Sequence, residues 1–435
     1  LPSKRAFAKN LGVSTITVES AYAQLVAEGF LYALPKRGYY VCDLERKETA
    51  PLPPPPKPQT PAIQPAPKRT YWADFVGSSV ARDMFPFSVG VKLLRDVTAG
   101  EDEATLLTDT SAGGIQQLRQ AISDHLYQFR GMSIDPEQIV VGAGIEYLLG
   151  CVAHLFGNCT AAIENPGYFR TRTVLQNSGI PCTLVDIDRE GLPADALEKS
   201  GANLCYLTPS HHFPTGVTMP APRRAQLLAW AAARPGRYIL EDDYDSEFRF
   251  DTRPLPSLQG MAGPNGPVVY LTTFSKSLAP GIRIACMVLP QSLLARYRRD
   301  FATYANTVSR FEQQTLCEFM AGGYFTRHLA RMRLAYKRRM EAFAAALRAA
   351  LPGVELDGVH SGLHFLLTLP QAESEAAMVQ AAAQHGVRLR GLSEYYMARP
   401  ELCRPNTVVA GYSALKEDDI PAVAAALAGA WCSFL

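Results

Sequence analysis

A lysine set among small hydroxyl residues is the first feature of this sequence that could do chemistry. Lys276 lies in the run TTFSKS (residues 272–277), and Arg283 follows it seven residues later. A lysine amine can form a Schiff base with an aldehyde. Thr273, Ser275 and Arg283 supply the hydroxyl and guanidinium groups that can hold a phosphate. A pyridoxal phosphate (PLP) pocket requires this combination.

An acidic segment upstream supplies the partner that such a cofactor needs. Asp242 and Tyr244 lie in the run EDDYDSEFRF, at residues 241–250. A carboxylate beside the pyridine nitrogen would keep it protonated, so that the ring can act as an electron sink. We assign this role to Asp242. Asp243 is the alternative, or else a partner on the other face of a sheet.

Three further segments are candidates for the same pocket. A glycine-rich turn at Gly142, Ala143 and Gly144 opens an apolar run at Ile145, so its amide groups can cradle a phosphate. Tyr168, in ENPGY, offers an aromatic ring that can stack on a flat cofactor.

The run HHFPTG (residues 211–216) holds two adjacent histidines. A lone histidine is usually structural, but we expect one of this pair to reach the oxygen edge of the cofactor. His212 is our candidate, and the choice between it and His211 stays open.

The elements that must position these residues follow an α/β rhythm. Apolar runs typical of strands alternate with amphipathic or alanine-rich runs typical of helices, which predicts a mostly parallel sheet covered on both faces. Active residues of such sheets lie at the carboxyl ends of strands. Asp242 follows the run 238–240, and Lys276 follows the run 268–271. The other strand candidates are 139–141, 160–163 and 204–207, with helices over 221–233 and 333–351.

A proline-rich segment divides the chain. The chain has 435 residues, which is too long for one core, and residues 51–70 contain nine prolines. Such a segment favours an extended polyproline spacer. We therefore predict a head at 1–47, a linker at 48–70 and a body at 71–435.

The head has the pattern of a small DNA-binding domain. Ser3 and Ser14 can cap helices over 4–10 and 14–28, and a hairpin with a basic tip at 35–38 follows. This predicts the latter part of a winged helix-turn-helix. The alternative is a small helical cap on the body. Residues 1–47 hold seven Lys/Arg against four acids, whereas the whole chain is balanced with 43 basic and 41 acidic residues.

Composition limits the remaining possibilities. The nine cysteines are scattered without metal-ligand spacing, so we expect no metal and unpaired thiols in a reducing cytoplasm. No apolar run is long enough to cross a bilayer, so we expect no membrane partner.

Two stretches resemble known families. The pattern LPS-x-R-x-x-A-x-x-L-G-V-S-x-x-T-V-x-x-A-Y-x-x-L at residues 1–25 resembles the GntR-type regulators, although their usual first helix is missing here. From about residue 72 onward, the ordered segments resemble the fold-type I aminotransferases. HHFPTG, EDDYDSEFRF and TFSKSLAPGIR together resemble the MocR subfamily, in which this body is fused to the DNA-binding head.

The resemblance implies a fold-type I body with a smaller C-terminal α+β subdomain, bound PLP and a homodimer. It gives Tyr244 to the phenolic oxygen of the cofactor and Arg170 to the carboxylate of an amino-acid-like effector. A second carboxylate-binding arginine is expected near the C-terminus, where Arg404, Arg399 and Arg390 are candidates and Arg404 is our choice.

Two consequences of the resemblance concern DNA binding and turnover. The expected DNA-binding residues lie at the two helix starts and the hairpin tip: Arg5, Ser14, Thr15, Thr17, Lys36 and Arg37. Phe213 stands where aminotransferases carry an asparagine, which lowers the expected turnover.

Three functions remain open from the sequence. The first is a PLP-dependent transcriptional regulator that binds a DNA operator and senses an amino-acid-like effector. The second is a genuine aminotransferase with a vestigial N-terminal extension. The third is a protein that senses PLP itself and performs no chemistry.

Overall fold

The computed structural model describes residues 1–43, 70–76, 80–100, 103–250 and 255–434. By their contacts these residues form two units, Leu1–Arg69 and Thr70–Leu435. Apart from Thr70, the predicted linker lies outside the described residues, as does the end of the predicted head after residue 43. The domain boundaries therefore stay a prediction.

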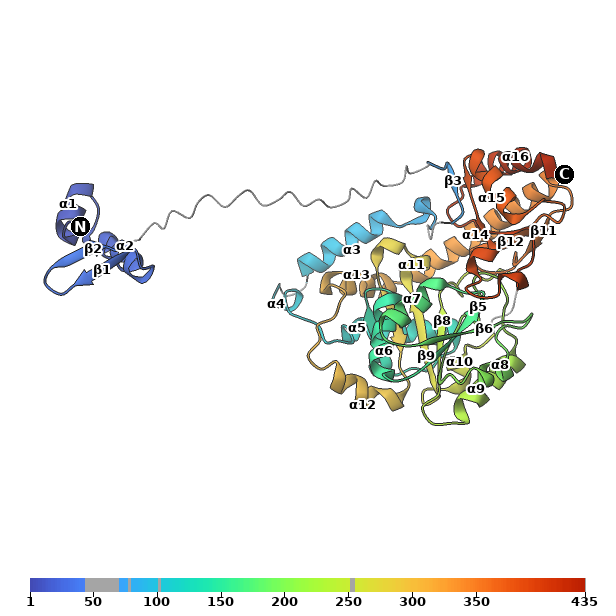
Figure 1. The fold of residues 1–435 in the computed structure, drawn as a ribbon, viewed down its shortest axis with the longest axis horizontal. Helices are drawn as coiled ribbons and strands as arrows, with labels where there is room; N and C mark the ends of the chain where they lie inside the picture. The colour runs from blue at the N-terminus through green and yellow to red at the C-terminus, as the bar shows by residue number, and fades with distance from the viewer. Residues whose placement is uncertain (44–69, 77–79, 101–102, 251–254, 435) are drawn as a thin grey trace. The chain divides into compact units, whose positions relative to one another are not determined.

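The head contains two capped helices and a hairpin (Figure 1). Helix α1 (Lys4–Leu11) begins after Ser3, whose side chain accepts a hydrogen bond from the Ala6 amide. It ends at Gly12, whose φ of 65° is readily adopted only by glycine. Helix α2 (Thr15–Ala27) begins after Ser14, whose side chain accepts from the Thr17 amide. The predicted helix-turn-helix is confirmed.

The wing is the antiparallel pair β1 (Leu31–Leu34) and β2 (Gly38–Val41). The core of the head is small, with Ala8, Val18, Tyr22 and Leu31 as its buried apolar residues. Capping and the tight hairpin therefore contribute much of the order of this unit.

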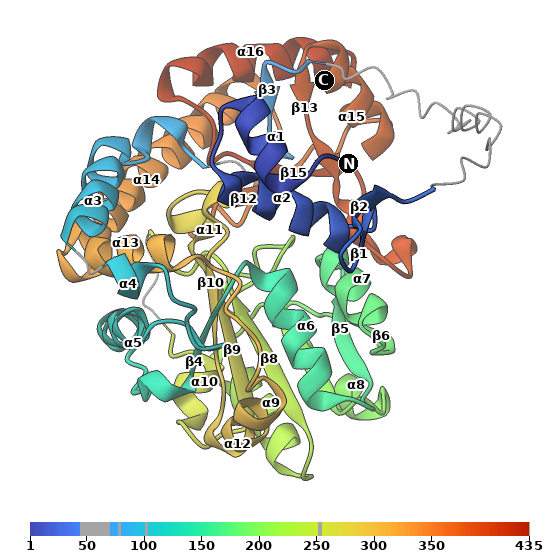
Figure 2. The ribbon, with the colours of Figure 1, turned by 90° about the vertical axis from the view of Figure 1, so that its left-hand side faces the viewer.

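The body is built on a seven-stranded sheet in the order β4-β10-β9-β8-β7-β5-β6 (Figure 2). Only β10 runs antiparallel to its neighbours, so the predicted mostly parallel sheet is confirmed. The strands are β4 (Ile139–Gly142), β5 (Ala161–Asn165), β6 (Cys182–Asp186), β7 (Leu204–Leu207), β8 (Tyr238–Asp243), β9 (Val268–Thr273) and β10 (Ala285–Val288).

Helices cover both faces of this sheet, because alternate strand residues face opposite sides and both sets are apolar. One face packs against α6 (Ile145–Phe156), α7 (Phe169–Asn177) and α12 (Gln291–Asp300). The other packs against α5 (Gln116–Arg130), α8 (Ala194–Lys199), α9 (Ala221–Ala232), α10 (Leu258–Ala262) and α13 (Arg310–Ala321). Helix α3 (Phe87–Gly100) lies beside α13, and the short helices are α4 (Glu103–Leu106) and α11 (Phe274–Ser277).

The long helix α14 (Tyr324–Ala350) leads into the smaller C-terminal subdomain. This subdomain has an antiparallel sheet in the order β11-β12-β15-β14 and the helices α15 (Glu375–Gln384) and α16 (Ile420–Trp431). Its strands are β11 (Glu355–Asp357), β12 (His364–Thr368), β14 (Arg390–Gly391) and β15 (Thr407–Gly411). The predicted α+β subdomain is confirmed.

The segment after Thr70 joins this subdomain. Strand β3 (Ala73–Asp74) pairs in parallel with β13 (Val387–Arg388), where Arg388 also forms an ion pair with Asp74. The body therefore begins on its smaller subdomain.

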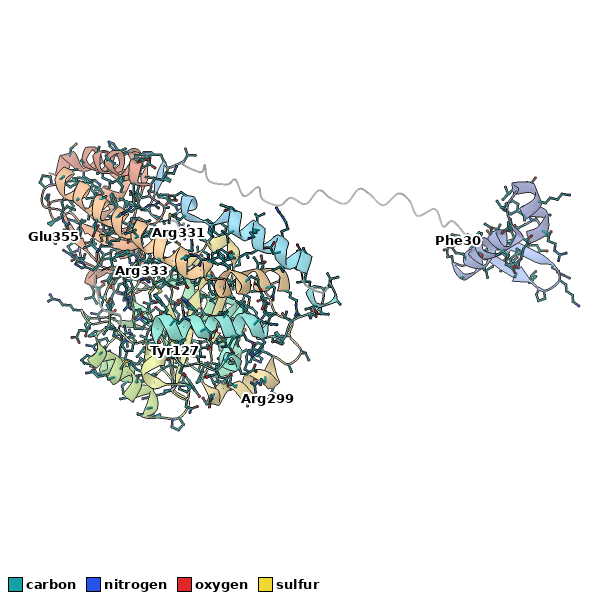
Figure 3. All side chains as sticks on the ribbon, turned by 180° about the vertical axis from the view of Figure 1, so that it is seen from behind. Phe30, Tyr127, Arg299, Arg331, Arg333 and Glu355 are labelled. Carbon is teal, nitrogen blue, oxygen red and sulfur yellow. The ribbon has the colours of Figure 1, made fainter. Side chains whose placement is uncertain are left out.

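Helix α14 also contacts the loop after β8 and helix α5, which lie beside the large sheet. Arg333 of α14 is labelled in Figure 3. It donates through Nε to the Glu247 carbonyl at 3.0 Å and lies over the ring of Phe129 in α5. None of the helices in the described parts is both long and apolar enough to cross a membrane.

Candidate functional site

Lys276 lies at the end of β9, in the short helix α11. Thr273 caps this helix, because its hydroxyl accepts from the Ser275 amide at 3.1 Å, and it also donates to the Ser275 hydroxyl at 2.9 Å. Burial lowers the pKa of Lys276 below its ordinary value, while Asp245 opposes that shift. A lower pKa leaves more of the amine neutral, which is the nucleophilic form.

Asp242 is the second-to-last residue of β8, in a buried position beside β9, the strand that leads to Lys276. One carboxylate oxygen accepts a hydrogen bond from the Tyr206 hydroxyl, and the other, Oδ1, is buried without a hydrogen-bond partner among the described residues. Burial raises the pKa of Asp242 to about 7. The site therefore holds a carboxyl group that a nearby cation would ionise.

Asp243 is committed to the opposite face of the sheet. Its Oδ2 accepts from the Tyr270 hydroxyl at 2.6 Å and from the Ser246 hydroxyl at 2.9 Å, and it pairs with Arg130 at 3.1 Å. Of the two alternatives for the cofactor's partner, the geometry favours Asp242.

The glycine-rich turn and Arg283 meet at the start of α6. Arg283 donates to the Ala143 carbonyl at 3.2 Å. A Cβ at Gly144 would lie 2.3 Å from an Arg283 nitrogen, so only glycine allows this approach. Arg283 itself has a φ of 52°. The two predicted phosphate-binding segments, far apart in the sequence, thus converge.

The Arg283 guanidinium already has a carboxylate partner, Glu146. The two form an ion pair at 3.0 Å at the first turn of α6, and both side chains are about half exposed. A phosphate bound here would compete with Glu146 for Arg283.

His212 lies beneath the pocket in a buried hydrogen-bonded group. Its Nδ1 lies 2.7 Å from the Thr215 hydroxyl, and its Nε2 lies 3.6 Å from Glu164. Burial lowers the pKa of His212 to about 3 and raises that of Glu164 to about 8. A neutral imidazole beside a protonated carboxyl is the form these shifts favour.

Phe213 is the centre of an aromatic wall. Its ring lies edge-on to Tyr168 at 5.8 Å, to His364 at 5.1 Å and to Tyr395 at 5.1 Å. Tyr168 precedes α7, so its ring is held at the end of β5 as the sequence predicts. The wall is apolar where an asparagine side chain would offer hydrogen bonds.

The two predicted effector arginines differ in their partners. Arg404 forms ion pairs with Glu355 and Asp357 of β11. Arg170 lies in the first turn of α7 next to Tyr168, whose pKa it lowers against the larger effect of burial. Arg170 is therefore the better placed of the two for a ligand carboxylate, and both assignments stay predictions.

Three residues that the sequence did not single out belong to this region. Tyr206 lies in the middle of β7, where an apolar run gives no sign of its bond to Asp242. Asp245 is within hydrogen-bond distance of His211 at 2.9 Å. His364 begins β12 and adjoins both.

In the head, the predicted DNA-binding residues lie on its surface. Thr15 and Thr17 are exposed at the start of α2, and Arg5 lies in α1. Ser14 is occupied by its cap and by the Thr17 hydroxyl at 2.8 Å. Lys36 and Arg37 form the exposed hairpin tip, where Lys36 has a φ of 62°.

The pocket residues fit PLP. Asp242 offers a buried unpartnered oxygen for a protonated ring nitrogen, and Gly144 leaves room for Arg283 at the start of α6. In the order of the sheet, β9, which leads to Lys276 at its carboxyl end, lies between β4, which leads to Gly144, and β8, which carries Asp242.

Regulators of transcription are similar to this chain over its whole length. The uncharacterized HTH-type transcriptional regulator YhdI of Bacillus subtilis is 36% identical over 440 residues, covering 100% of this chain and 92% of its own. The HTH-type pyridoxine biosynthesis transcriptional regulator PdxR of Corynebacterium glutamicum is 30% identical, covering 99% and 90%. The probable rhizopine catabolism regulatory protein MocR of Rhizobium meliloti is 29% identical, covering 92% and 83%.

Among solved structures, a kynurenine aminotransferase of Pyrococcus horikoshii in complex with PMP has a TM-score of 0.72 at 25% identity. The likeness covers 85% of this chain and 92% of that one, so the body has the aminotransferase fold. No family model matches the chain. With relatives at 36% identity along its full length, the chain belongs to the MocR-like family of GntR-type HTH transcriptional regulators.

Proposed function

We propose that this protein is a PLP-dependent transcriptional regulator of the cytoplasm, whose head binds a DNA operator and whose body senses an amino-acid-like effector. The observation that carries the proposal is the placement of Lys276, Asp242 and the contact between Arg283 and the glycine-rich turn at the carboxyl ends of β9, β8 and β4, in a chain that also has an exposed helix-turn-helix. The free cysteines of the described residues agree with a reducing compartment.

Each pocket residue has a role that its surroundings support. Lys276 supplies the amine that holds the cofactor covalently, and its lowered pKa favours that bond. Asp242, oriented by Tyr206, would pair with the ring nitrogen. Arg283, Ser275, Thr273 and the turn at Gly142–Ile145 hold the phosphate, with the start of α6 contributing its dipole. Bound PLP supplies an aldehyde and an electron-withdrawing ring.

Effector recognition is assigned to Arg170 and Arg404. Arg170 binds a carboxylate through two parallel hydrogen bonds. Arg404 is a second candidate and must leave Glu355 and Asp357 to take part. The aromatic wall around Phe213 gives the ligand an apolar boundary on one side.

DNA binding is assigned to the start of α2 and the wing. Thr15 and Thr17 lie where a recognition helix contacts base edges, and Lys36 and Arg37 where a wing contacts phosphates or the minor groove.

The oligomeric state that we propose is a homodimer. Helix α3 exposes large apolar side chains, with Phe87 68%, Val91 56% and Leu94 44% exposed. Contiguous apolar surface of this kind favours association, and a second copy of the body is the occupant that we propose.

The aminotransferase alternative is not favoured, because the relatives at 36% identity are regulators and Phe213 replaces a polar residue. A PLP sensor is a second candidate. It is supported by the regulator of pyridoxine biosynthesis, which is 30% identical to this chain.

Borohydride reduction tests the proposal. Wild-type protein mixed with PLP should become labelled at Lys276, and Lys276→Ala should lose the label, while Lys92→Ala, an exposed lysine of α3, keeps it. Sustained keto-acid formation at about 1 per second or faster would decide for an aminotransferase. Attachment of PLP to a lysine other than Lys276 would contradict the proposed cofactor site.

A further inference from the structure

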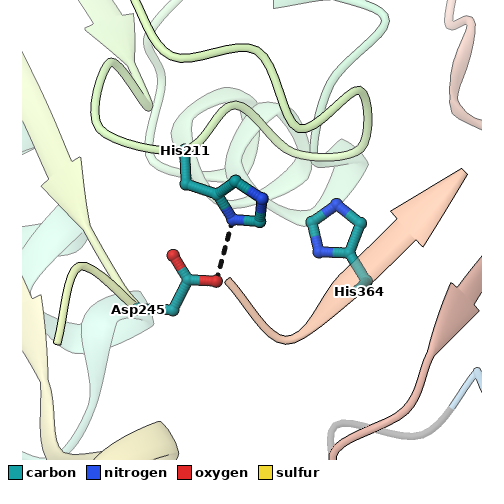
Figure 4. Close-up of side chains that lie close together, drawn as sticks. All are labelled: His211, Asp245 and His364. Atoms are coloured by element: carbon teal, nitrogen blue, oxygen red, sulfur yellow. Dashed lines mark hydrogen bonds and ion pairs between the residues drawn. The ribbon is translucent and has the colours of Figure 1, made fainter. Parts of the chain in front are cut away.

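Beside the pocket, His211, Asp245 and His364 converge from three different segments (Figure 4). His211 lies in the loop after β7, Asp245 follows β8, and His364 begins β12 of the smaller subdomain. All three are buried, with 2%, 2% and 5% exposed surface. A buried polar group usually needs a defined partner, so this arrangement calls for an explanation.

The hydrogen bonds of His211 fix where its protons are. Its Nδ1 lies 2.9 Å from Asp245 Oδ2 and 3.1 Å from the Tyr244 hydroxyl. A carboxylate oxygen accepts, so this contact is a hydrogen bond when Nδ1 carries the proton and donates it to Asp245. A protonated Nδ1 cannot accept from Tyr244.

The Tyr244 hydroxyl therefore does not donate its proton to His211. Burial raises the pKa of Tyr244 well above its ordinary value, so the phenol keeps its proton. The hydroxyl oxygen can accept weakly from Nδ1, while its own proton is available to another acceptor. Tyr244 follows Asp242 by two residues, so the acceptor that we expect is a ligand atom in the same pocket.

We propose that Asp245 and His211 form a positioning pair that keeps the Tyr244 hydroxyl a hydrogen-bond donor toward a ligand in the pocket. This inference rests on the proposed function, because the ligand is the cofactor proposed above. Asp245 touches no reacting atom in this scheme and acts through His211.

The smaller subdomain encloses the pair. A Cβ at Gly362 would lie 1.8 Å from His211 Cε1, so the turn before β12 packs directly on the imidazole. His364 donates through Nε2 to the Pro214 carbonyl at 3.0 Å, and its ring centroid lies 4.7 Å from that of His211. His211 Nε2 is left buried without a hydrogen-bond partner among the described residues, as a neutral ring with its proton on Nδ1 would be.

Two histidines and a carboxylate are also a donor set that Zn²⁺ takes. Each histidine here already uses one ring nitrogen in a hydrogen bond to a protein oxygen, while His211 Nε2 and Asp245 Oδ1 are buried without a hydrogen-bond partner among the described residues. The hydrogen-bonded pair accounts for more of these contacts, so metal binding is an outcome for the experiment.

The first measurement is the tautomer of His211 in the cofactor-free full chain, by nitrogen-15 NMR of the imidazoles, assigned by its loss in His211→Gln. Wild type should carry the proton on Nδ1. Asp245→Ala should move it to Nε2, because Tyr244 then donates to Nδ1, whereas Tyr244→Phe should leave it on Nδ1. An Nε2 proton in wild type, or an unchanged tautomer in folded Asp245→Ala, would overturn the proposal.

The second measurement is a double-mutant cycle on the binding of PLP. Asp245→Ala should weaken binding about tenfold, the equivalent of one net hydrogen bond. In the Tyr244→Phe background the same change should have an effect of less than about twofold. An equal loss in both backgrounds contradicts a role through Tyr244, and His385→Asn, on the exposed end of α15, serves as the control.

The two measurements separate this inference from the proposed function. If wild type shows the predicted tautomer but does not bind PLP, the pair stands as a hydrogen-bonding arrangement and the cofactor proposal fails. Stoichiometric Zn²⁺ binding that Asp245→Ala abolishes would replace the positioning pair with a metal site.

Discussion

The carboxylates of Asp242 and Asp243 are neighbours in β8 and lie on opposite faces of the sheet. Asp242 shares its face with Tyr206, and Asp243 shares the other with Tyr270. This alternation separates a group assigned to function from one that holds the fold together.

Replacing each with asparagine should therefore have different consequences. Asp243→Asn should lower the free energy of unfolding by about 3 kcal/mol, because Arg130 keeps a buried charge without its partner. Chemical denaturation measures this loss, and a loss below about 1 kcal/mol would contradict the ion pair's role.

Asp242→Asn should weaken PLP binding yet stabilise the cofactor-free protein at alkaline pH. Burial raises the folded-state pKa of Asp242 to about 7, from 3.8, so the folded state holds this proton more tightly than the unfolded state. The group therefore costs stability as the pH rises from about 4 through about 7. At about pH 8 the variant should exceed wild type by at least about 1 kcal/mol, and at about pH 4 the two should converge.

The sequence carried enough information to predict this part of the site. Regular alternation along β8 places Asp242 and Asp243 on different faces, and strand ends place Lys276 and the glycine-rich turn at one edge. Arg283 was predicted to bind phosphate from its spacing to Lys276; it contacts the glycine-rich turn, and its role stays a prediction.

Other features could not be read from local patterns. Tyr206 resembles any buried strand residue, and His364 joins His211 only because two subdomains meet there. The strands β6 and β10 were not among the sequence candidates. They are short runs whose strand character depends on pairing with β5, β4 and β9, which a local pattern does not contain.

Removing the competitor of Arg283 should strengthen phosphate binding. Glu146→Gln deletes the carboxylate that pairs with Arg283 and should tighten PLP binding about two- to fivefold, the range of an exposed ion pair. Equilibrium binding measures the change. Glu137→Gln, which alters a surface acid paired with Arg298, is the control and should have no effect. Weaker binding in Glu146→Gln would mean that Glu146 holds Arg283 in place for the phosphate.

The wing should contribute to DNA affinity through its charge more than through recognition of a particular sequence. Replacing Lys36 and Arg37 with glutamine should weaken DNA binding on all sequences and reduce the slope of log affinity against log salt by about two. Lys199→Gln, an exposed lysine of the body, should change neither. An unaltered slope would show that the hairpin tip does not contact DNA.

The two proposed effector arginines should differ in how much each contributes to ligand binding. Arg170→Ala should weaken the response of the bound cofactor's absorbance to an amino-acid ligand about tenfold, because it removes a charge-assisted hydrogen bond. Arg404→Ala should have the smaller effect, since Arg404 must first leave Glu355 and Asp357. A ligand screen read by absorbance ranks the two, and a stronger loss in Arg404→Ala would reverse the assignment. Resting absorbance should survive both changes.

The pairing of β3 with β13 determines where the body is tethered. Because Ala73 is hydrogen-bonded into the smaller subdomain, the described part of the body begins on that subdomain and not on the large sheet. Any rotation of the subdomain about the end of α14 carries the attachment point with it. A ligand that changed the orientation of the smaller subdomain would therefore move β3, the first strand of the body, with it.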